Sequence, residues 1–195
     1  YYDINEDKDK KHDRVIFHLS RNQKLIYNDV RKFGFIKFIK NINLKQNLHL
    51  KNLGPEPLEK KFNFSYFKQY IINKNRTIKD ILMDQKFISG LGNIYVNETL
   101  FFSGIKPTKK VKNLSEGEIR KIIKFIKRIL SKAIALGGSS IKNFSSDNGK
   151  KGLFQQYFCV YGKKGEKCSK KSCGSNIIKI VISNRATFYC DKCQK

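Results

Sequence analysis

Short apolar runs alternate with polar segments in the first forty positions of the chain. Residues 15–19 and 24–27 are β-leaning runs joined by the polar stretch 20–23, a pattern that predicts a β-hairpin. Residues 33–39 form another such run, in which Gly34 allows a bulge or a close backbone approach. Because three strands with one apolar face are barely self-sufficient, we expect them to pack on the rest of the chain or to belong to a larger sheet.

The pattern changes at a short connector, residues 53–58, that contains two prolines. Each proline fixes its own φ and biases the preceding residue away from helix, so we place a domain boundary there. Residues 60–136 have helical periodicity, most clearly after Ser115, whose side chain can cap a helix while Glu118 completes a capping box. The glycine pair at 137–138 ends this helix. One of its faces carries a set of apolar residues: Ile119, Ile122, Ile123, Ile126, Ile129, Leu130, Ala133 and Ile134.

Charge narrows the class of partner. The chain has 41 Lys and Arg against 16 Asp and Glu, a formal net charge of +25, which predicts a polyanionic partner. Nucleic acid fits better than a membrane, because the sequence has no apolar run of membrane-spanning length and no lipidation signal. An A+T-biased genome would also enrich Lys, Asn and Ile, so the motifs must carry the site. A solvated surface and a phosphate-facing one both fit the basic face of the last predicted helix: Lys121, Lys124, Lys127 and Arg128.

Four of the five cysteines form two close pairs near the end of the sequence. Cys168 and Cys173 are separated by four residues, Cys190 and Cys193 by two, and sixteen residues lie between the pairs. Such spacing predicts one structural Zn2+ site, because tetrahedral zinc needs four soft ligands and each short loop presents two sulfurs to one point. Two disulfides or free thiols are the alternatives, which the absence of an export signal disfavours.

The residues between the cysteine pairs are sufficient for a second β-hairpin. Residues 177–182 are strand-like and residues 183–184 supply a turn, so Arg185 follows the tip directly. A zinc-stiffened hairpin with an arginine at its tip can enter a DNA groove at little ordering cost, although an ordinary solvated arginine fits the same sequence. Upstream, residues 155–161 are also strand-like, and Cys159 is expected there as a small core residue.

Residues 185–194, RATFYCDKCQ, and the preceding segment 160–166 form a recognisable motif. They resemble the C-terminal zinc-finger signature of the formamidopyrimidine-DNA glycosylase family and the strand that leads into that finger, and further segments resemble this family in its own order. Residues 82–85 together with residues 90–95, GLGNIY, resemble its helix-two-turn-helix element. Two further segments resemble parts of its N-terminal β-sandwich: residues 11–13 and 31–34. The resemblance runs from residue 11 to residue 195 and its motifs are specific.

The resemblance implies an α+β fold in three parts. Residues 1–52 would be a remnant of the N-terminal catalytic β-sandwich, residues 53–157 a helix-two-turn-helix DNA-binding domain, and residues 158–195 a β-hairpin zinc finger. The polar, aperiodic stretch 143–154 predicts a mobile loop. It resembles the segment that closes over an everted oxidised purine in this family, and flexibility is what such a lid requires.

Seven residues match DNA-binding positions of the family: His12, Arg31, Phe33, Lys74, Lys79, Asn93 and Arg185. The glycines before Asn93 predict a tight turn that opens a helix, where free backbone N–H groups can bind a phosphate. Phe33 resembles the family's wedge, an aromatic that enters the base stack while Arg31 fills the space of the departed base. A plain sheet-core phenylalanine is the alternative for Phe33.

The family's chemistry is bifunctional. An N-terminal proline amine attacks the sugar C1′ of the flipped nucleotide, expels the base and forms a Schiff base that permits strand cleavage. That proline, the adjacent glutamate and the β-elimination lysine would lie upstream of Tyr1, and Arg185 alone matches a catalytic position, associated with δ-elimination. The resemblance therefore implies an enzyme for oxidised purines, 8-oxoguanine and formamidopyrimidines, whose present chain binds duplex DNA without cutting it.

The sequence departs from the family pattern at a few positions. Val30 and Lys32 stand where the family usually has Pro and Arg, and the first zinc loop is longer than usual. Lysine keeps the charge but loses the bidentate fork, so we expect a weaker phosphate contact at position 32. The resemblance also implies a monomer that acts in the bacterial cytoplasm at the nucleoid. A zinc-ribbon protein that binds nucleic acid without catalysis is the alternative hypothesis.

Overall fold

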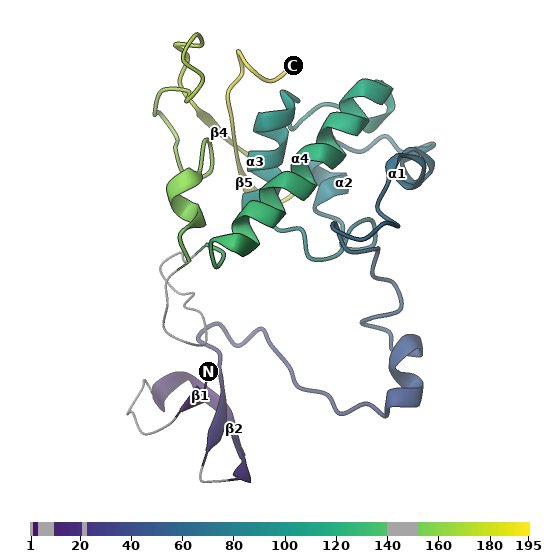
Figure 1. The fold of residues 1–195 in the computed structure, drawn as a ribbon, viewed down its shortest axis with the longest axis vertical. Coiled ribbons are helices and arrows are strands. Elements are labelled where there is room, and N and C mark those ends of the chain that lie inside the picture. Colours follow the sequence, from purple (N-terminus) through teal and green to yellow (C-terminus); the bar gives the residue numbers. More distant parts are fainter. Residues whose placement is uncertain (1, 4–9, 21–22, 140–151) are drawn as a thin grey trace.

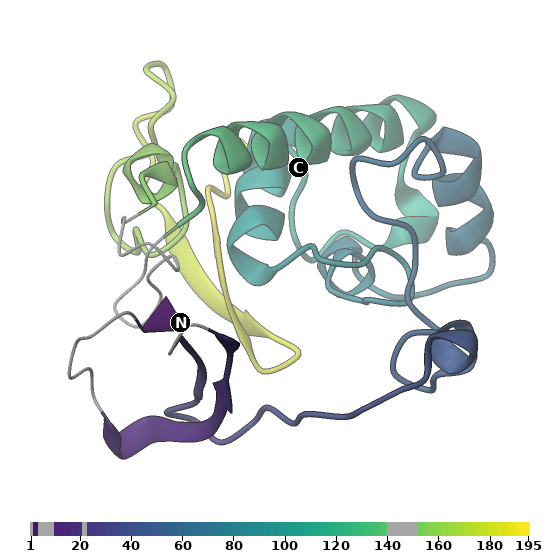
Figure 2. The same ribbon diagram turned by 60° about the horizontal axis from the view of Figure 1, so that its bottom comes forward.

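The structure, a computed structural model, describes residues 2–3, 10–20, 23–139 and 152–195. They form an α+β fold in which a small N-terminal sheet is joined by a long extended segment to a larger helical body with a C-terminal hairpin (Figures 1 and 2). The strands are β1 (Tyr2–Asp3), β2 (Asp13–His18), β3 (Lys24–Asn28), β4 (Ile178–Ile182) and β5 (Arg185–Tyr189). The α-helices are α1 (Phe64–Ile71), α2 (Ile78–Leu82), α3 (Asn93–Ser103) and α4 (Glu116–Ala135). Short 3-10 helices span Lys10–His12, Asn41–Gln46, Val111–Asn113 and Phe154–Tyr157.

The predicted N-terminal hairpin is present. Strands β2 and β3 pair antiparallel with Phe17 opposite Leu25, and β1 joins the other edge of β3, giving the strand order β1-β3-β2. Ile26 is the one hydrophobic side chain that the sheet buries among the described residues, whereas Ile16 and Leu25 remain exposed. The sheet therefore contributes little core of its own.

Two predicted strands are wrong. Residues 33–39 form no strand, because the Asp29 carboxylate accepts the N–H groups of Arg31, Lys32 and Gly34 at 2.8–2.9 Å and turns the chain away from the sheet. Without a partner strand this β-leaning run stays extended, and Phe38 is 89% exposed. Residues 155–161 also form no strand: a 3-10 helix occupies their first part, and Phe154 at its start packs on α4 residues Ile129 and Ala133.

The helical body has the core that the first part lacks. Helix α4 packs along α3, and its predicted capping box is formed by the Ser115 hydroxyl, which accepts the Glu118 N–H at 3.2 Å, and the Glu118 carboxylate, which accepts the Ser115 N–H at 2.9 Å. Gly137, with φ of 70°, ends the helix as predicted. Phe67 and Phe87, fully buried with ring centroids 4.9 Å apart, hold α1 against the turn after α2. None of the described helices is long and apolar enough to cross a membrane.

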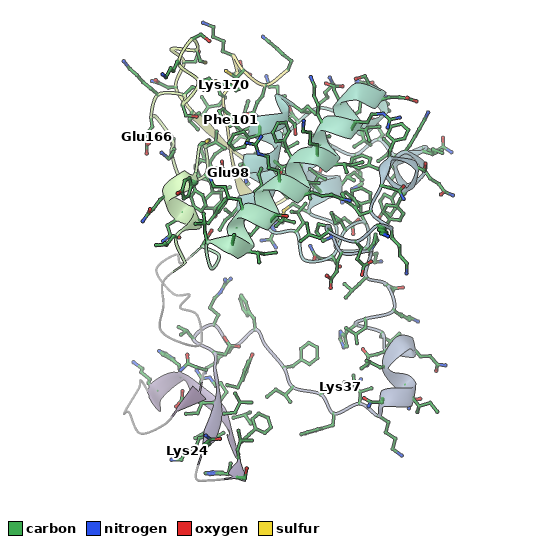
Figure 3. The ribbon with its side chains drawn as sticks, viewed as in Figure 1. Lys24, Lys37, Glu98, Phe101, Glu166 and Lys170 are labelled. Carbon is green, nitrogen blue, oxygen red and sulfur yellow. The ribbon has the colours of Figure 1, made fainter. Side chains whose placement is uncertain are left out.

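Helix α3 is central to the body, because its buried polar side chains bind two segments of the C-terminal region, residues 159–161 and strand β5. The carboxylate of Glu98, a side chain labelled in Figure 3, accepts three backbone N–H groups, those of Cys159 at 2.9 Å, Val160 at 3.0 Å and Tyr161 at 2.9 Å. Asn97 accepts the N–H of Phe188 in β5 at 2.7 Å. Burial raises the pKa of Glu98 even though these N–H groups favour its charged form. The hairpin is thus fixed to α3 by hydrogen bonds inside the protein.

We expect Glu98→Ala to destabilise the zinc-loaded protein by about 3 kcal/mol, because buried N–H groups would lose their acceptor. Glu116→Ala is the matched control, since Glu116 is an exposed residue of α4 whose ion pair with Lys68 is open to solvent. Urea titration measures both free energies of unfolding. Equal, small changes in the two variants would show that Glu98 does not hold the hairpin.

Candidate metal centre and nucleic-acid interface

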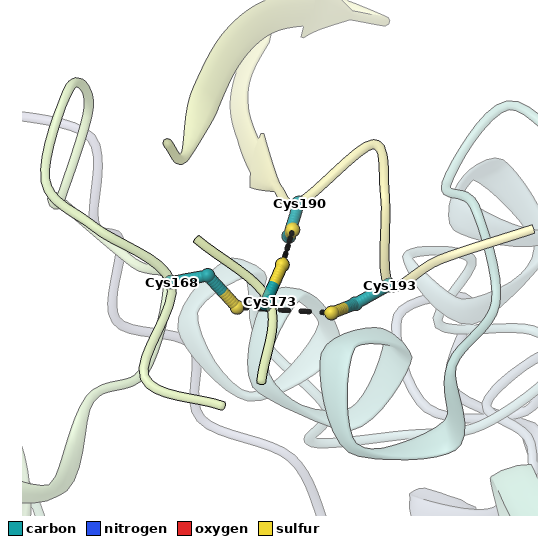
Figure 4. A group of neighbouring side chains, drawn as sticks. All are labelled: Cys168, Cys173, Cys190 and Cys193. Carbon is teal, nitrogen blue, oxygen red and sulfur yellow. Dashed lines mark hydrogen bonds between the residues drawn. The ribbon is translucent and has the colours of Figure 1, made fainter. Parts of the chain in front are cut away.

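The four predicted cysteine ligands converge on one point. The Sγ atoms of Cys168, Cys173, Cys190 and Cys193 all lie within 4.8 Å of one another (Figure 4). The Cys168–Cys193 sulfurs are 3.8 Å apart and the Cys173–Cys190 sulfurs 3.4 Å apart, too far for disulfides, whose sulfurs lie about 2.05 Å apart. A zinc ion with Zn–S bonds of about 2.3 Å places its tetrahedral sulfurs about 3.8 Å apart. The cluster therefore fits one structural zinc.

The electrostatics of the cluster are consistent with a bound cation. Hydrogen bonding from the Ser175 backbone and from neighbouring thiols lowers the pKa of Cys173 to about 6. Burial, followed by the other three thiols, raises the pKa of Cys193 to about 12. Four thiolates at these distances repel one another, so all four deprotonate together only around a metal ion. Cys159 lies outside the cluster, half-buried after the 3-10 helix and not on a strand as predicted.

The second predicted hairpin is β4–β5, and its turn lies where the sequence placed it. Ile182 pairs with Arg185, and Ser183 and Asn184 between them have φ of 47° and 59°, the left-handed conformation that two-residue hairpin turns require. The tip lies against α2 and the start of α3, because Ser183 is hydrogen-bonded to Asp80 and Ala186 to Asn93. Arg185 is exposed there.

One carbonyl of the hairpin brings three predicted DNA-binding residues together. The Ala186 carbonyl accepts a hydrogen bond from the Lys79 ammonium at 3.2 Å and from the Asn93 side-chain amide at 3.0 Å. Ala186 directly follows Arg185, so the cation at the tip lies beside the start of α3, where Gly92 is the N-cap and the first N–H groups of the helix are free of intrahelical partners. This corner therefore combines two cations, an amide and a helix N-terminus.

The corner is hollow and positively charged. A polar pocket of about 480 Å³ lies between α2 and the hairpin tip, with four cationic side chains in its lining: Arg76, Lys79, Lys86 and Arg185. Each of the two acids in the lining already has a partner within the protein: Asp84 accepts from Arg76 at 2.7 Å, and Asp80 accepts from the Ser183 hydroxyl at 2.6 Å. A pocket with these groups can hold a phosphate. Another hollow, about 610 Å³ beside the end of α4, has a mainly apolar lining without a cation.

Lys79 has an unusual environment for a lysine. Its side chain is 1% exposed, and burial, followed by the nearby charge of Arg185, lowers its pKa from 10.5 to about 7, while Asp80 acts in the opposite direction. A bound phosphate would supply the counter-charge that restores its ordinary pKa. No local pattern in the sequence indicates this burial.

The remaining predicted residues lie away from this corner. His12 is half-buried at the start of the N-terminal sheet, and its carbonyl accepts the Asp29 N–H at 3.0 Å. The Arg31 guanidinium lies 4.7 Å from the Phe33 ring, and Phe33 is 76% exposed, so it is not a sheet-core residue. Lys74, between α1 and α2, lies over the Tyr70 ring at 4.5 Å. The predicted loop 143–154 lies mostly outside the described residues.

Comparisons with known proteins agree with this geometry. The family model described as the formamidopyrimidine-DNA glycosylase H2TH domain matches residues 53–145, and the zinc finger found in FPG and IleRS matches residues 165–195. Formamidopyrimidine-DNA glycosylase of Rickettsia bellii is 44% identical over 186 residues, which cover 95% of this chain and 67% of that protein. The chain belongs to the formamidopyrimidine-DNA glycosylase family. It spans about two thirds of the length of this relative, and the enzyme of Roseobacter denitrificans, 39% identical, is covered to 66%.

Solved structures of the family have the same fold. The Lactococcus lactis FPG mutant G226P in complex with a Fapy-dG containing DNA is 38% identical with a TM-score of 0.89, and the match covers 100% of this chain and 71% of that one. The MutM (FPG) protein of Thermus thermophilus is 31% identical with a TM-score of 0.88, and the match covers 96% of this chain and 70% of that one. The α+β fold, the helix-two-turn-helix region and the zinc-finger hairpin that the sequence predicted are thus confirmed.

Sequence reasoning missed four residues of the pocket: Arg76, Asp80, Lys86 and Ser183. One signal was available, because Thr77 followed by Asp80 is a helix-capping pattern, and the Thr77 hydroxyl does accept the Asp80 N–H at 3.1 Å. No local sequence pattern predicts that the hairpin tip contacts α2, because the residues in contact are more than 100 positions apart in the sequence.

We expect one zinc per chain by metal analysis of the purified protein, with Cys190→Ser losing the metal and lowering the melting temperature. Cys159→Ser is the matched control, because Cys159 lies outside the cluster, and it should keep both the zinc and the melting temperature. Wild-type protein that contains no zinc, and whose melting temperature does not rise when zinc is added, would contradict the site.

Lys79 gives stability a pH dependence whose sign follows from its lowered pKa. Between pH 7 and 10.5 the unfolded chain binds this proton and the folded chain does not, so the free energy of unfolding rises with pH, by at most about 1.4 kcal/mol per unit. Lys79→Met should remove this contribution. Urea titrations of both proteins from pH 6.5 to 9.5 measure the two slopes, and identical slopes would show that Lys79 titrates normally.

Proposed function

We propose that this chain is the DNA-gripping part of a base-excision repair glycosylase and apurinic-site lyase that removes oxidised purines, 8-oxoguanine and formamidopyrimidines, from duplex DNA. The observation that carries the proposal is the corner at Ala186, whose carbonyl gathers Lys79 and Asn93 beside Arg185. Relatives that are 37–44% identical carry the name formamidopyrimidine-DNA glycosylase, and homologous structures contain DNA with Fapy-dG or an abasic site. We propose that this chain also binds duplex DNA that contains an oxidised purine or an abasic site.

In this proposal each residue of the corner has a separate task. Lys79 and Arg185 bind backbone phosphates next to the lesion as charged donors, and Arg185 additionally assists δ-elimination. Asn93 and the free N–H groups at the start of α3 bind a further phosphate oxygen. These contacts fix the register of the duplex and carry no sequence information, as suits an enzyme that must inspect every base pair.

The N-terminal sheet and its exposed extension supply the wedge. Phe33, exposed and free of any core, enters the stack at the extruded base, and the adjacent Arg31 fills the vacated space. His12 and Lys74 are proposed to bind DNA as well, Lys74 near the lesion and its phosphates. The lid over the everted purine, predicted at residues 143–154, stays a proposal, since residues 143–151 lie outside the described part of the chain. We propose that the chain has three structural units, residues 1–52, 53–157 and 158–195.

The zinc ion would be held by Cys168, Cys173, Cys190 and Cys193 and would be structural, because four thiolate ligands leave no coordination position for water or substrate. These four residues connect the two loops at the base of the hairpin, while α3 contacts strand β5 and α2 contacts the hairpin tip. The protein is proposed to act as a monomer in the cytoplasm.

The covalent step needs an amine nucleophile. The three prolines among these residues, Pro55, Pro57 and Pro107, are internal amides without a nucleophilic nitrogen. A polypeptide of these 195 residues is therefore proposed to recognise an abasic duplex without forming the Schiff base.

We expect this polypeptide to bind an abasic duplex with an affinity that falls roughly tenfold or more between 50 and 200 mM salt, because several phosphates are neutralised. Borohydride should trap no covalent adduct. Fluorescence anisotropy and denaturing gels measure the two properties, with an undamaged duplex as control. Equal affinity for damaged duplex, undamaged duplex and single-stranded RNA would favour the non-catalytic zinc-ribbon alternative, and efficient trapping would show another amine acting as nucleophile.

A further inference from the structure

An aspartate lies in the lining of the cationic pocket and binds the hairpin tip. Asp80 in α2 accepts the Ser183 hydroxyl at 2.6 Å through one carboxylate oxygen and the Thr77 hydroxyl at 2.6 Å through the other. Thr77 is the N-cap of α2. One carboxylate thus joins the start of this helix to the turn of a hairpin that is 103 residues further along the chain.

A negative charge at this place is unfavourable for phosphate binding. Asp80 directly follows Lys79 and lies in the same pocket lining as Arg185. Hydrogen bonds from Ser183 and Thr77, with the charge of Arg76, outweigh the effect of burial and lower the pKa of Asp80, so it is ionised at neutral pH. Attraction of the phosphate therefore cannot explain why Asp80 lies among these cations.

The backbone of the turn supports a role in docking. Ser183 has φ of 47°, a conformation that glycine and asparagine adopt at lower cost, so a serine there is explained by what its hydroxyl binds. That hydroxyl donates to Asp80 and holds the turn against α2. Arg185 is two residues further on, at the first position of β5.

The other contacts at the tip depend on groups that DNA would use. Lys79 and Asn93 donate to the Ala186 carbonyl, and both are proposed to turn to phosphate oxygens when DNA binds. In the bond between Asp80 and Ser183 the acceptor cannot turn to a phosphate, because carboxylate and phosphate oxygens are both acceptors, and the donor lies outside the proposed DNA-binding set. It can persist while the other two contacts are lost.

We propose that Asp80 is a positioning residue, whose hydrogen bond with Ser183 docks the hairpin tip on α2 and so keeps Arg185 beside Lys79 when a duplex phosphate enters the pocket. The inference rests on the proposed DNA-binding function and extends it to a residue that carries the wrong charge for the ligand. Asp80 acts through Arg185 and does not contact DNA.

The test is a double-mutant cycle in the zinc-loaded 195-residue protein, with an abasic duplex as the probe in fluorescence anisotropy at fixed salt. Asp80→Ala and Ser183→Gly should each weaken binding about tenfold, the worth of one hydrogen bond to a charged group. The double variant should also be about tenfold weaker, because both changes remove the same bond. Ser183→Gly suits the left-handed turn, so it removes the hydroxyl without backbone strain.

Two further variants separate position from charge. Asp80→Asn keeps an oxygen for Ser183, and its affinity should stay within about threefold of wild type. Glu116→Ala removes the same charge from the exposed start of α4 and should not weaken binding. Zinc content and melting temperature of every variant are measured alongside, and binding is compared well below the lowest melting temperature.

Several results would overturn the inference. A double variant about a hundredfold weaker would show two independent effects, and Asp80→Ala with wild-type affinity would show that docking does not need this bond. Asp80→Asn as weak as Asp80→Ala would show that the charge matters and the hydrogen bond does not. Wild-type protein that fails to bind any duplex would refute the proposed function itself, which separates that failure from the failure of Asp80.

Discussion

The structure depends on one constraint, the burial of polar side chains on α3. Asn97 and Glu98 lie on a helix that is covered on one side by α4 and on the other by β5, where no water can satisfy them. Their partners are backbone N–H groups of the zinc-finger region, those of Phe188 and of residues 159–161. Because unpaired buried polar groups are costly, the finger has one orientation on the helical body that satisfies both sides.

That single orientation explains the position of the cations. The finger is held at three levels: the cysteine cluster at its base, α3 along β5, and α2 at the tip (Figures 1 and 4). Several acids of the body pair with lysines, as Glu118 does with Lys109 at 2.6 Å. Arg185 lies in the pocket lining with no acid bound to it among the described residues. A surface with a net charge of +25 would attract DNA anywhere, but this corner combines that charge with fixed geometry.

Local patterns predicted the parts whose cause is local. The capping box at Ser115, the glycine pair that ends α4, the turn at 183–184 and the spacing of the cysteines all reflect interactions within a few residues, and the structure has each of them. The strand expected at 33–39 failed because a strand also needs a partner, which the sequence of the run does not reveal. The burial of Lys79 and the approach of Ser183 to Asp80 were invisible for the same reason, since both arise from docking of the finger. The DNA-binding roles of all seven residues came from family resemblance and stay predictions: His12, Arg31, Phe33, Lys74, Lys79, Asn93 and Arg185.

Native-state hydrogen exchange tests the central constraint most directly, because it reports on the N–H groups that Asn97 and Glu98 bind. In the zinc-loaded protein, the amides of Val160, Tyr161 and Phe188 should exchange as slowly as the core amides of α3, since they open only when the finger leaves the helix. Exchange of these three amides as fast as that of exposed loop amides, such as Lys164, would show that the finger moves freely on the body and would contradict the account.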